Sequence, residues 1–239
     1  MIAIILASGR GTRLQPLTNK RPKPLVKVDN IPLLGIQLDA LQQHGITKII
    51  ITTGPFPNQI HSFADEYTEL DIKFVHNQMY AKTNYILSLW LAGQALKKLN
   101  INEDIVLLHG DLAFEETVLD RLLAADVDNG VIVNQNTDPS PKDFCVSLVG
   151  NCISRIDTHL EGENVHQLYP IYKLSREAFE SWLIAMGELI KQGGDGEYAE
   201  AALNKLLPKI IIRPVLISEF CAEVDNHEDL QVVKKWWHE

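Results

Sequence analysis

Glycines and cations follow the first apolar segment of the chain in a pattern that suits phosphate binding. Gly9 and Gly11, separated by one residue, come directly after the apolar run 2–7. Glycine lets backbone N–H groups approach a ligand closely, and successive N–H groups in a turn form a concave anion site. Cations are frequent in the same stretch: Arg10, Arg13, Lys20, Arg21, Lys23 and Lys27. The residues therefore predict a loop that binds a polyphosphate.

Two common phosphate motifs are absent from this loop. It has no Gly-x-x-x-x-Gly-Lys-[Ser/Thr] pattern, and Leu14 stands where a dinucleotide-binding loop has its third glycine. A bare Gly-x-Gly after a strand is also compatible with a tight turn that binds nothing. The cluster of cations, together with Pro16, Pro22 and Pro24, which restrict the backbone, favours phosphate binding over a purely structural turn.

A longer pattern spans the whole loop. Residues 6–18 read L-A-S-G-R-G-T-R-L-Q-P-L-T, and P-K-P-L-V follows at 22–26. This pattern resembles the signature of the sugar-phosphate nucleotidyltransferases, with Ser8 where alanine or glycine is usual. The resemblance implies that the loop wraps a nucleoside triphosphate. Arg13 would then stabilise the α-phosphate and the leaving pyrophosphate, and Lys23 would bridge the nucleotide and acceptor phosphates. The nucleotide-binding residues that it implies here are Leu6, Ala7, Ser8, Gly9, Gly11, Thr12 and Arg13.

Two aspartates are candidates for a metal site. Asp111 follows the apolar run 105–108, and Asp225 follows Glu223-Val224. Ligands of α/β sheets bind at the carboxyl ends of strands, and Mg²⁺ prefers one or two carboxylates with phosphate oxygens and water. Each aspartate is also placed to cap a helix, Asp111 before residues 112–123 and Asp225 before the last helix. The resemblance favours Mg²⁺ at both aspartates. His109 is expected to pack or to support the site, because no second histidine has a suitable spacing.

A second segment narrows the resemblance. Residues 80–89 read Tyr-Ala-x-x-Asn-x-x-x-Ser-Leu. This is similar to the bacterial choline-phosphate cytidylyltransferases, a small single-domain branch that makes CDP-choline, and it implies CTP as the nucleotide. Amide and backbone groups can recognise cytosine. The residues expected to contact the nucleotide beyond the loop are Gly54, Gln78, Thr83, Asn84 and Gly110. A polar turn at Gln78 and a helix cap at Thr83 or Asn84 are the structural alternatives.

The acceptor is expected to bind in the second half of the chain. Aromatic faces and a carboxylate would hold a quaternary ammonium group. The candidate residues are Tyr169, Tyr172, Glu197, Tyr198 and Glu200. Alternatively, the tyrosines pack against a sheet and the glutamates are solvated. Choline phosphate is the leading acceptor, and a phosphonate, glutamine phosphate or another small phosphorylated alcohol stays open. The rival functions are a sugar-1-phosphate nucleotidyltransferase that uses UTP, dTTP or GTP, and a non-catalytic nucleotide-sensing subunit.

The pattern of elements predicts the scaffold for this site. Continuous apolar runs at 2–6, 48–52, 71–75 and 104–108 are typical of strands that are buried on both faces. Helical patterns alternate with them at 32–44, 84–99 and 115–125. Strand–helix alternation implies parallel strands joined by right-handed crossovers. The expected fold is therefore α/β, a three-layer doubly wound, Rossmann-like domain with a mixed, mostly parallel sheet.

The second half is less regular. Strands are expected at 131–133, 144–148, 152–156, 165–173 and 220–224, with a hairpin at Gly150-Asn151, and helices at 175–190, 197–206 and 228–237. The expected organisation is one domain over 1–239, in which residues 1–134 bind the nucleotide and residues 135–239 bind the acceptor and end in a helix.

Composition excludes several partners. The 239 residues carry 22 Lys+Arg and 31 Asp+Glu, a formal net charge of −9, which argues against nucleic acids and anionic membranes. No apolar stretch is long enough for a membrane span. The cysteines, Cys145, Cys152 and Cys221, lack metal-ligand spacing and fit a reducing cytoplasm. Trp236 and Trp237 suit either packing or a subunit contact, so a homodimer is left open.

Overall fold

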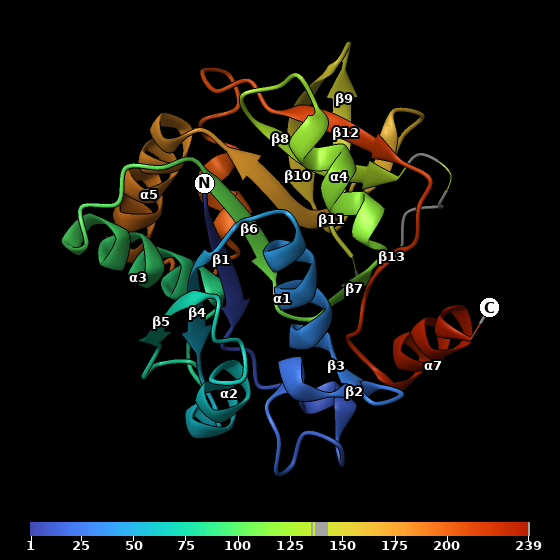
Figure 1. Ribbon diagram of the computed structural model, residues 1–239. Coiled ribbons are helices and arrows are strands. Elements are labelled where there is room, and N and C mark those ends of the chain that lie inside the picture. Colours follow the sequence, from blue (N-terminus) through green and yellow to red (C-terminus); the bar gives the residue numbers. More distant parts are fainter. Residues whose placement is uncertain (135, 137–142, 239) are drawn as a thin grey trace.

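The computed structural model describes residues 1–134, 136 and 143–238. Within these residues a nine-stranded mixed sheet forms the centre of the molecule (Figure 1), in the order β10-β9-β11-β6-β1-β4-β5, with β8 beside β11 and β12 beside β8. Its strands are β1 (Ile2–Ala7), β4 (Lys48–Thr53), β5 (Asp71–His76), β6 (Ile105–His109), β8 (Gly130–Asn134), β9 (Cys145–Val149), β10 (Cys152–Asp157), β11 (Val165–Leu174) and β12 (Arg213–Ile217). The four strands of the N-terminal half are parallel, and β11 is antiparallel to its neighbours β6, β8 and β9.

Helices cover both faces of the sheet. One face carries α1 (Leu33–Gln43), α2 (Pro57–Ala64) and α4 (Glu116–Ala124), and the other carries α3 (Tyr85–Lys98), α5 (Arg176–Lys191) and α6 (Ala199–Leu203). The side chains of β1 alternate between these layers: Ile2 and Ile4 pack in the core beside α3, whereas Ala3 and Ile5 pack in the core beside α1. This arrangement explains the continuous apolar strands, and it confirms the predicted three-layer, doubly wound α/β fold.

A small third core joins the two ends of the sequence. Two 3-10 turns, η1 (Thr12–Leu14) and η2 (Lys23–Leu25), precede a short hairpin of β2 (Lys27–Val28) and β3 (Ile31–Pro32). A second pair of strands, β7 (Leu112–Phe114) and β13 (Cys221–Glu223), leads into α7 (His227–Trp237). Leu14, Val26, Val224 and Leu230 pack together here, and α7 lies beside β2 (Figure 1). The segment around residue 225 is thereby brought to the N-terminal loop.

Some predicted elements differ from the structure. The helix expected at 197–206 covers only Ala199–Leu203 and continues as turns toward Pro208, which disfavours helical geometry at the preceding residue. Helix α2 and strands β7 and β12 were not predicted. Strand β12 carries Pro214 and pairs only with β8 among the described strands, and an edge is where a strand tolerates proline. Among the described residues, no helix has both the length and the apolar character needed to cross a membrane.

Both proposed aspartate caps are wrong. Strand β7 follows Asp111 directly, and α4 does not begin until Glu116. The last helix is capped by Asn226, whose side chain accepts hydrogen bonds from the backbone N–H groups of Glu228 and Asp229. The side chains of Asp111 and Asp225 are therefore available for other contacts.

Candidate active site

The glycine loop after β1 is tightly supported. Gly11 adopts a left-handed conformation (φ 63°), which glycine tolerates best, and its carbonyl accepts a hydrogen bond of 2.7 Å from Thr18 Oγ1. Gly54 lies behind the loop, where a Cβ atom would come within 2.2 Å of the Ser8 carbonyl oxygen. The Ser8 hydroxyl in turn contacts the Ser88 hydroxyl of α3 at 2.6 Å. The loop is therefore held from below by β4 and α3, and its other side is open.

A cavity of about 400 Å³ opens at the carboxyl ends of β1 and β6. Most of the predicted site residues line it: Leu6, Ala7, Ser8, Gly9, Gly11, Thr12, Arg13, Lys23, Thr83, Asn84, Gly110, Asp111, Tyr198 and Asp225. They come from segments that are far apart in the sequence. The fold thus brings the glycine loop, both aspartates and one predicted acceptor residue to one cavity.

Lys23 connects the two aspartates. Its side chain is only 9% exposed, and Nζ lies 2.5 Å from Asp111 Oδ2 and 2.6 Å from Asp225 Oδ1. Arg13 Nη2 contacts the other oxygen of Asp225 at 2.8 Å. Burial alone would lower the pKa of Lys23, but the carboxylates of Asp111 and Asp225 outweigh burial and raise it above the ordinary value. Lys23 is therefore a fixed positive charge on the floor of the cavity.

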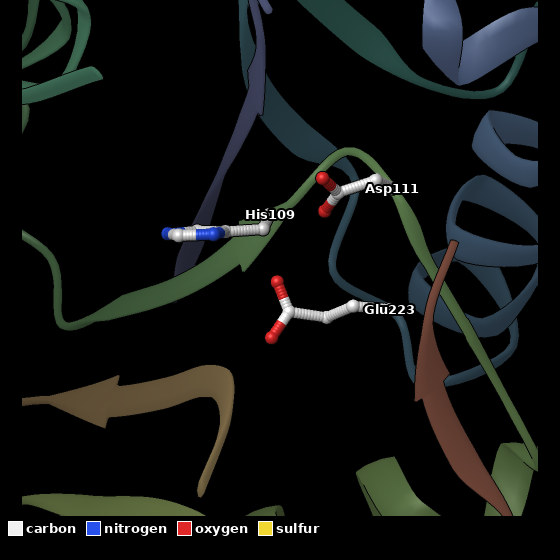
Figure 2. Close-up of side chains that lie close together, drawn as sticks. All are labelled: His109, Asp111 and Glu223. Atoms are coloured by element: carbon white, nitrogen blue, oxygen red, sulfur yellow. The ribbon is translucent and has the colours of Figure 1, made fainter. Parts of the chain in front are cut away.

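A cluster that suits a cation lies beside this lysine. His109, Asp111 and Glu223 each offer one ligand atom, and these three atoms lie within 4.8 Å of one another (Figure 2). Asp111 Oδ1 and Glu223 Oε1 are buried and have no hydrogen-bond partner among the described residues. Buried carboxylate oxygens without partners are costly unless a cation or a proton satisfies them. The residues present therefore fit a divalent cation.

The electrostatics of this cluster follow from burial and from like charges. Burial, together with Asp111 and Asp225 nearby, raises the pKa of Glu223 well above its usual range. Burial would also raise the pKa of Asp111, but Lys23 reverses that effect and lowers it. Burial lowers the pKa of His109 in spite of the neighbouring carboxylates, so its imidazole is neutral near pH 7. Of the two carboxyl groups in this cluster, Glu223 is therefore the one that takes up a proton more readily.

Aromatic side chains form the opposite wall. The ring of Tyr198 lies 5.7 Å from that of Tyr85 and 5.1 Å from that of Phe144. Glu200 is buried behind them and accepts hydrogen bonds from the hydroxyl groups of Tyr85 and Tyr172, the latter at 3.0 Å. A second cavity of about 280 Å³ shares Phe144 and Tyr198 with the first, and it also contacts Glu197 and Glu200. This side of the site combines aromatic faces with carboxylates.

Several predicted residues lie elsewhere. Tyr169 and Tyr172 are buried in the core on β11 and line neither cavity. Both tyrosines therefore pack against the sheet, as the structural alternative expected. Gln78 is exposed in a turn outside the cavity lining, and Gly54 supports the loop from behind. Asn84 lines the cavity but is also the N-cap of α3, where it accepts a hydrogen bond from the Tyr85 N–H.

Several residues of the cavity lining were not predicted, among them Glu223, Tyr85 and Phe144. Glu223 could have been predicted from the sequence, because it lies two residues before Asp225 and alternate residues of an extended segment point to the same side. Tyr85 and Phe144 carried no such signal, since they come together only because both rings pack against Tyr198. Thr83 was predicted, and its hydroxyl donates to the Met79 carbonyl, which is a local turn contact.

Comparison with known proteins identifies the family. Residues 3–181 match the model of the MobA-like NTP transferase domain. The chain belongs to this family. The match includes the glycine loop, Lys23 and Asp111, but it ends before Tyr198, Glu223 and Asp225. The predicted membership of a nucleotidyltransferase family is thereby confirmed, and the C-terminal part of the site rests on the geometry described above.

Individual relatives of this MobA-like domain resemble it over part of their length. The chain is 41% identical over 96 residues to choline-phosphate cytidylyltransferase of Streptococcus pneumoniae, covering 40% of this chain and 41% of the relative. It is 33% identical over 138 residues to CMP-5'-(3-aminopropyl)phosphonate synthase of Streptomyces rubellomurinus, covering 57% of this chain and 21% of the relative. The chain thus spans between about a fifth and about half of the length of the curated relatives that it matches.

Unlike the sequence similarity, the similarity in fold to a solved structure covers nearly the whole chain. The structure of CTP:phosphocholine cytidylyltransferase from Streptococcus pneumoniae superimposes with a TM-score of 0.81 at 20% identity, covering 99% of this chain and 98% of that one. At this identity the likeness establishes the fold and leaves the substrates to be argued from the site.

Proposed function

We propose that the protein transfers CMP from CTP to a small phosphorylated acceptor, with release of pyrophosphate. The observation that carries this proposal is the convergence of Arg13 and Lys23 with Asp111 and Asp225 in the cavity above the glycine loop. A turn without a ligand has no need to bury a lysine between two carboxylates beneath an open cavity. The family match and the two cytidylyl-type relatives support the choice of nucleotide.

The proposed reaction needs charge and position more than proton transfer. An oxygen of the acceptor's phosphate attacks the α-phosphorus of CTP in line, and the bond to pyrophosphate breaks. The attacking oxygen is already anionic, so no general base is required. The glycine loop orients the triphosphate, while Arg13 and Lys23 stabilise the negative charge of the transition state. A bound divalent cation, held by carboxylates of the site, would neutralise phosphate oxygens in addition.

Choline phosphate is the acceptor that we propose. Phe144 and Tyr198 line both cavities, Tyr85 lines the first, and Glu200 supplies a buried carboxylate behind these rings. Aromatic faces with a nearby negative charge recognise quaternary ammonium groups. The same wall would also accept a primary ammonium group. An acceptor with a cationic head group is therefore favoured over a neutral sugar phosphate.

A substrate panel tests the nucleotide and the acceptor together. Pyrophosphate release is measured with CTP, UTP, dTTP and GTP, each against choline phosphate, 3-aminopropylphosphonate and glucose 1-phosphate. We expect the highest kcat/KM for CTP with choline phosphate. A preference for UTP or dTTP with glucose 1-phosphate would contradict the proposal, and nucleotide binding without turnover on any acceptor would indicate a nucleotide sensor.

One variant separates the two substrates. Tyr198→Ala removes one of the two aromatic rings that both cavities share, so we expect a higher KM for choline phosphate and an unchanged KM for CTP. Ile184→Ala, an exposed substitution on α5, is the control. An equal effect on both KM values would contradict the placement of the acceptor. The division into nucleotide and acceptor halves, the cytoplasmic location and the homodimer stay predictions.

A further inference from the structure

The cluster of His109, Asp111 and Glu223 has a mixed set of ligand atoms. His109 ends β6, Asp111 follows it after one residue, and Glu223 ends β13, where it lies opposite Leu112 of β7 (Figure 2). One imidazole nitrogen and two carboxylate oxygens lie within 4.8 Å of one another. This differs from the predicted pair Asp111 and Asp225, which contains oxygen ligands only.

The three side chains have free ligand atoms. His109 is 8% exposed, and its Nε2 has no hydrogen-bond partner among the described residues. Asp111 Oδ1 and Glu223 Oε1 are likewise buried without a partner there. A native protein rarely buries three unpartnered polar groups in one place unless something else satisfies them.

Asp225, unlike the three residues of the cluster, has both carboxylate oxygens in ion pairs with basic side chains. One of its oxygens contacts Lys23 Nζ at 2.6 Å, and the other contacts Arg13 Nη2 at 2.8 Å. A cation bound between Asp111 and Asp225 would therefore have to displace Lys23. A cation at the three-residue cluster would not, because Asp111 uses Oδ2 for Lys23 and keeps Oδ1 free.

We propose that His109, Asp111 and Glu223 form a site for a divalent transition-metal cation, while Asp225 holds Lys23 and Arg13 in place. A nitrogen ligand distinguishes metals: imidazole binds first-row transition ions, with affinity rising from Mn²⁺ to Cu²⁺, whereas Mg²⁺ favours oxygen ligands. The site is expected to bind Mn²⁺ more tightly than Mg²⁺. The position of the ion beside the triphosphate rests on the proposed function, but its binding does not require nucleotide.

Binding of Mn²⁺ to the full chain without nucleotide tests the site. The free ion is followed by electron paramagnetic resonance during titration, and pulsed measurements detect ¹⁴N coupling to the bound ion. We expect one tight Mn²⁺ ion with ¹⁴N coupling, displaced by Mg²⁺ only at large excess. His109→Ala should abolish the coupling and weaken binding at least about 10-fold, since even outer groups of metal sites contribute that much. Glu223→Gln should weaken binding similarly.

Two variants serve as controls. Asp225→Asn should change Mn²⁺ affinity much less than Glu223→Gln, although both remove one carboxylate from the site. Glu228→Gln, an exposed change on α7, should have no effect. Loss of Mn²⁺ binding in Asp225→Asn together with normal binding in His109→Ala would overturn the proposal.

The wild-type chain alone also decides the question. Bound Mn²⁺ without ¹⁴N coupling, or no Mn²⁺ binding in the absence of nucleotide, would overturn the proposal even if the variants failed to fold. The two proposals fail separately. A chain that binds Mn²⁺ through nitrogen but transfers no CMP would contradict the proposed function only, and CMP transfer with an all-oxygen metal site would contradict this inference only.

Discussion

Replacing Lys23 by methionine tests the central electrostatic feature of the site. Methionine keeps the apolar stem that lies against Gly11 but removes the ammonium group between Asp111 and Asp225. These carboxylates have side chains that are 20% and 14% exposed, so water cannot fully replace the lost charge. Packing is thus nearly preserved, while two close, mostly buried negative charges lose their shared partner.

The size of the effect follows from this geometry. Removing one member of a buried ion pair costs about 3–5 kcal/mol, and the partial exposure of the aspartates brings the expected loss of stability toward the lower end. For a chain of this size 3 kcal/mol corresponds to a fall in Tm of about 6–12 °C. Loss of one positioned group that stabilises transition-state charge lowers kcat by about 10²–10³.

Two measurements check this expectation. Thermal unfolding is followed with and without about 5 mM divalent cation, which is enough to fill typical sites. Pyrophosphate release gives kcat. The cation should restore part of the stability of Lys23→Met, because it supplies the missing positive charge. Lys27→Met, which removes an exposed cation four residues away, is the matched control and should change stability by less than about 0.5 kcal/mol. A kcat of Lys23→Met close to that of the wild type would refute the assigned role of Lys23.

Other substitutions address the loop, the acidic cluster and the acceptor wall. Gly54→Ala places a methyl group against the Ser8 carbonyl and should lower both Tm and CTP affinity, whereas Gly196→Ala, with no atom within 4 Å, should be neutral in the same assays. Glu223 has a raised pKa, so the metal-free wild type loses stability as the pH rises above about 4.5, the ordinary pKa of glutamate. Glu223→Gln should therefore be more stable than the wild type at pH 7 without metal, and the difference in Tm should vanish near pH 4. Glu200→Gln should raise the KM for choline phosphate about 10-fold, or about 1.4 kcal/mol, and leave the KM for CTP unchanged in steady-state kinetics.

The N-terminal half of the fold could be predicted because its signals are local. Strands β1, β4 and β6 are buried on both faces and read as unbroken apolar runs, so their bounds agree with the structure to within a residue or two. Helices α1 and α3 between them have apolar stripes and clear ends, whereas α2, with eight residues, was missed. The elements that were missed are short or atypical: β7 has three residues, and β12 includes a proline. Their strand geometry comes from a partner strand that is distant in the sequence.

The candidate site likewise has one part that the sequence predicts and another that it does not. The glycine loop, Lys23 and Asp111 belong to continuous patterns, and the structure brings them together as those patterns suggest. Tyr172 shows the limit of such reasoning, because an aromatic residue on a central strand has the same composition signal whether it packs in the core or lines a cavity. Phe144 lines the cavity only because β9 returns beside β11. No spacing in the sequence contains that information.

The balance of charge in the cavity links these features. Four carboxylates, those of Asp111, Asp143, Glu223 and Asp225, line the cavity with three cations, Arg10, Arg13 and Lys23. The raised pKa of Glu223 offsets the excess negative charge with a proton when no metal is bound. A divalent cation would displace that proton and change the sum from neutral to positive, which is the sign that attracts a triphosphate. Metal binding should therefore release a proton, strengthen as the pH rises, and precede or accompany the binding of nucleotide.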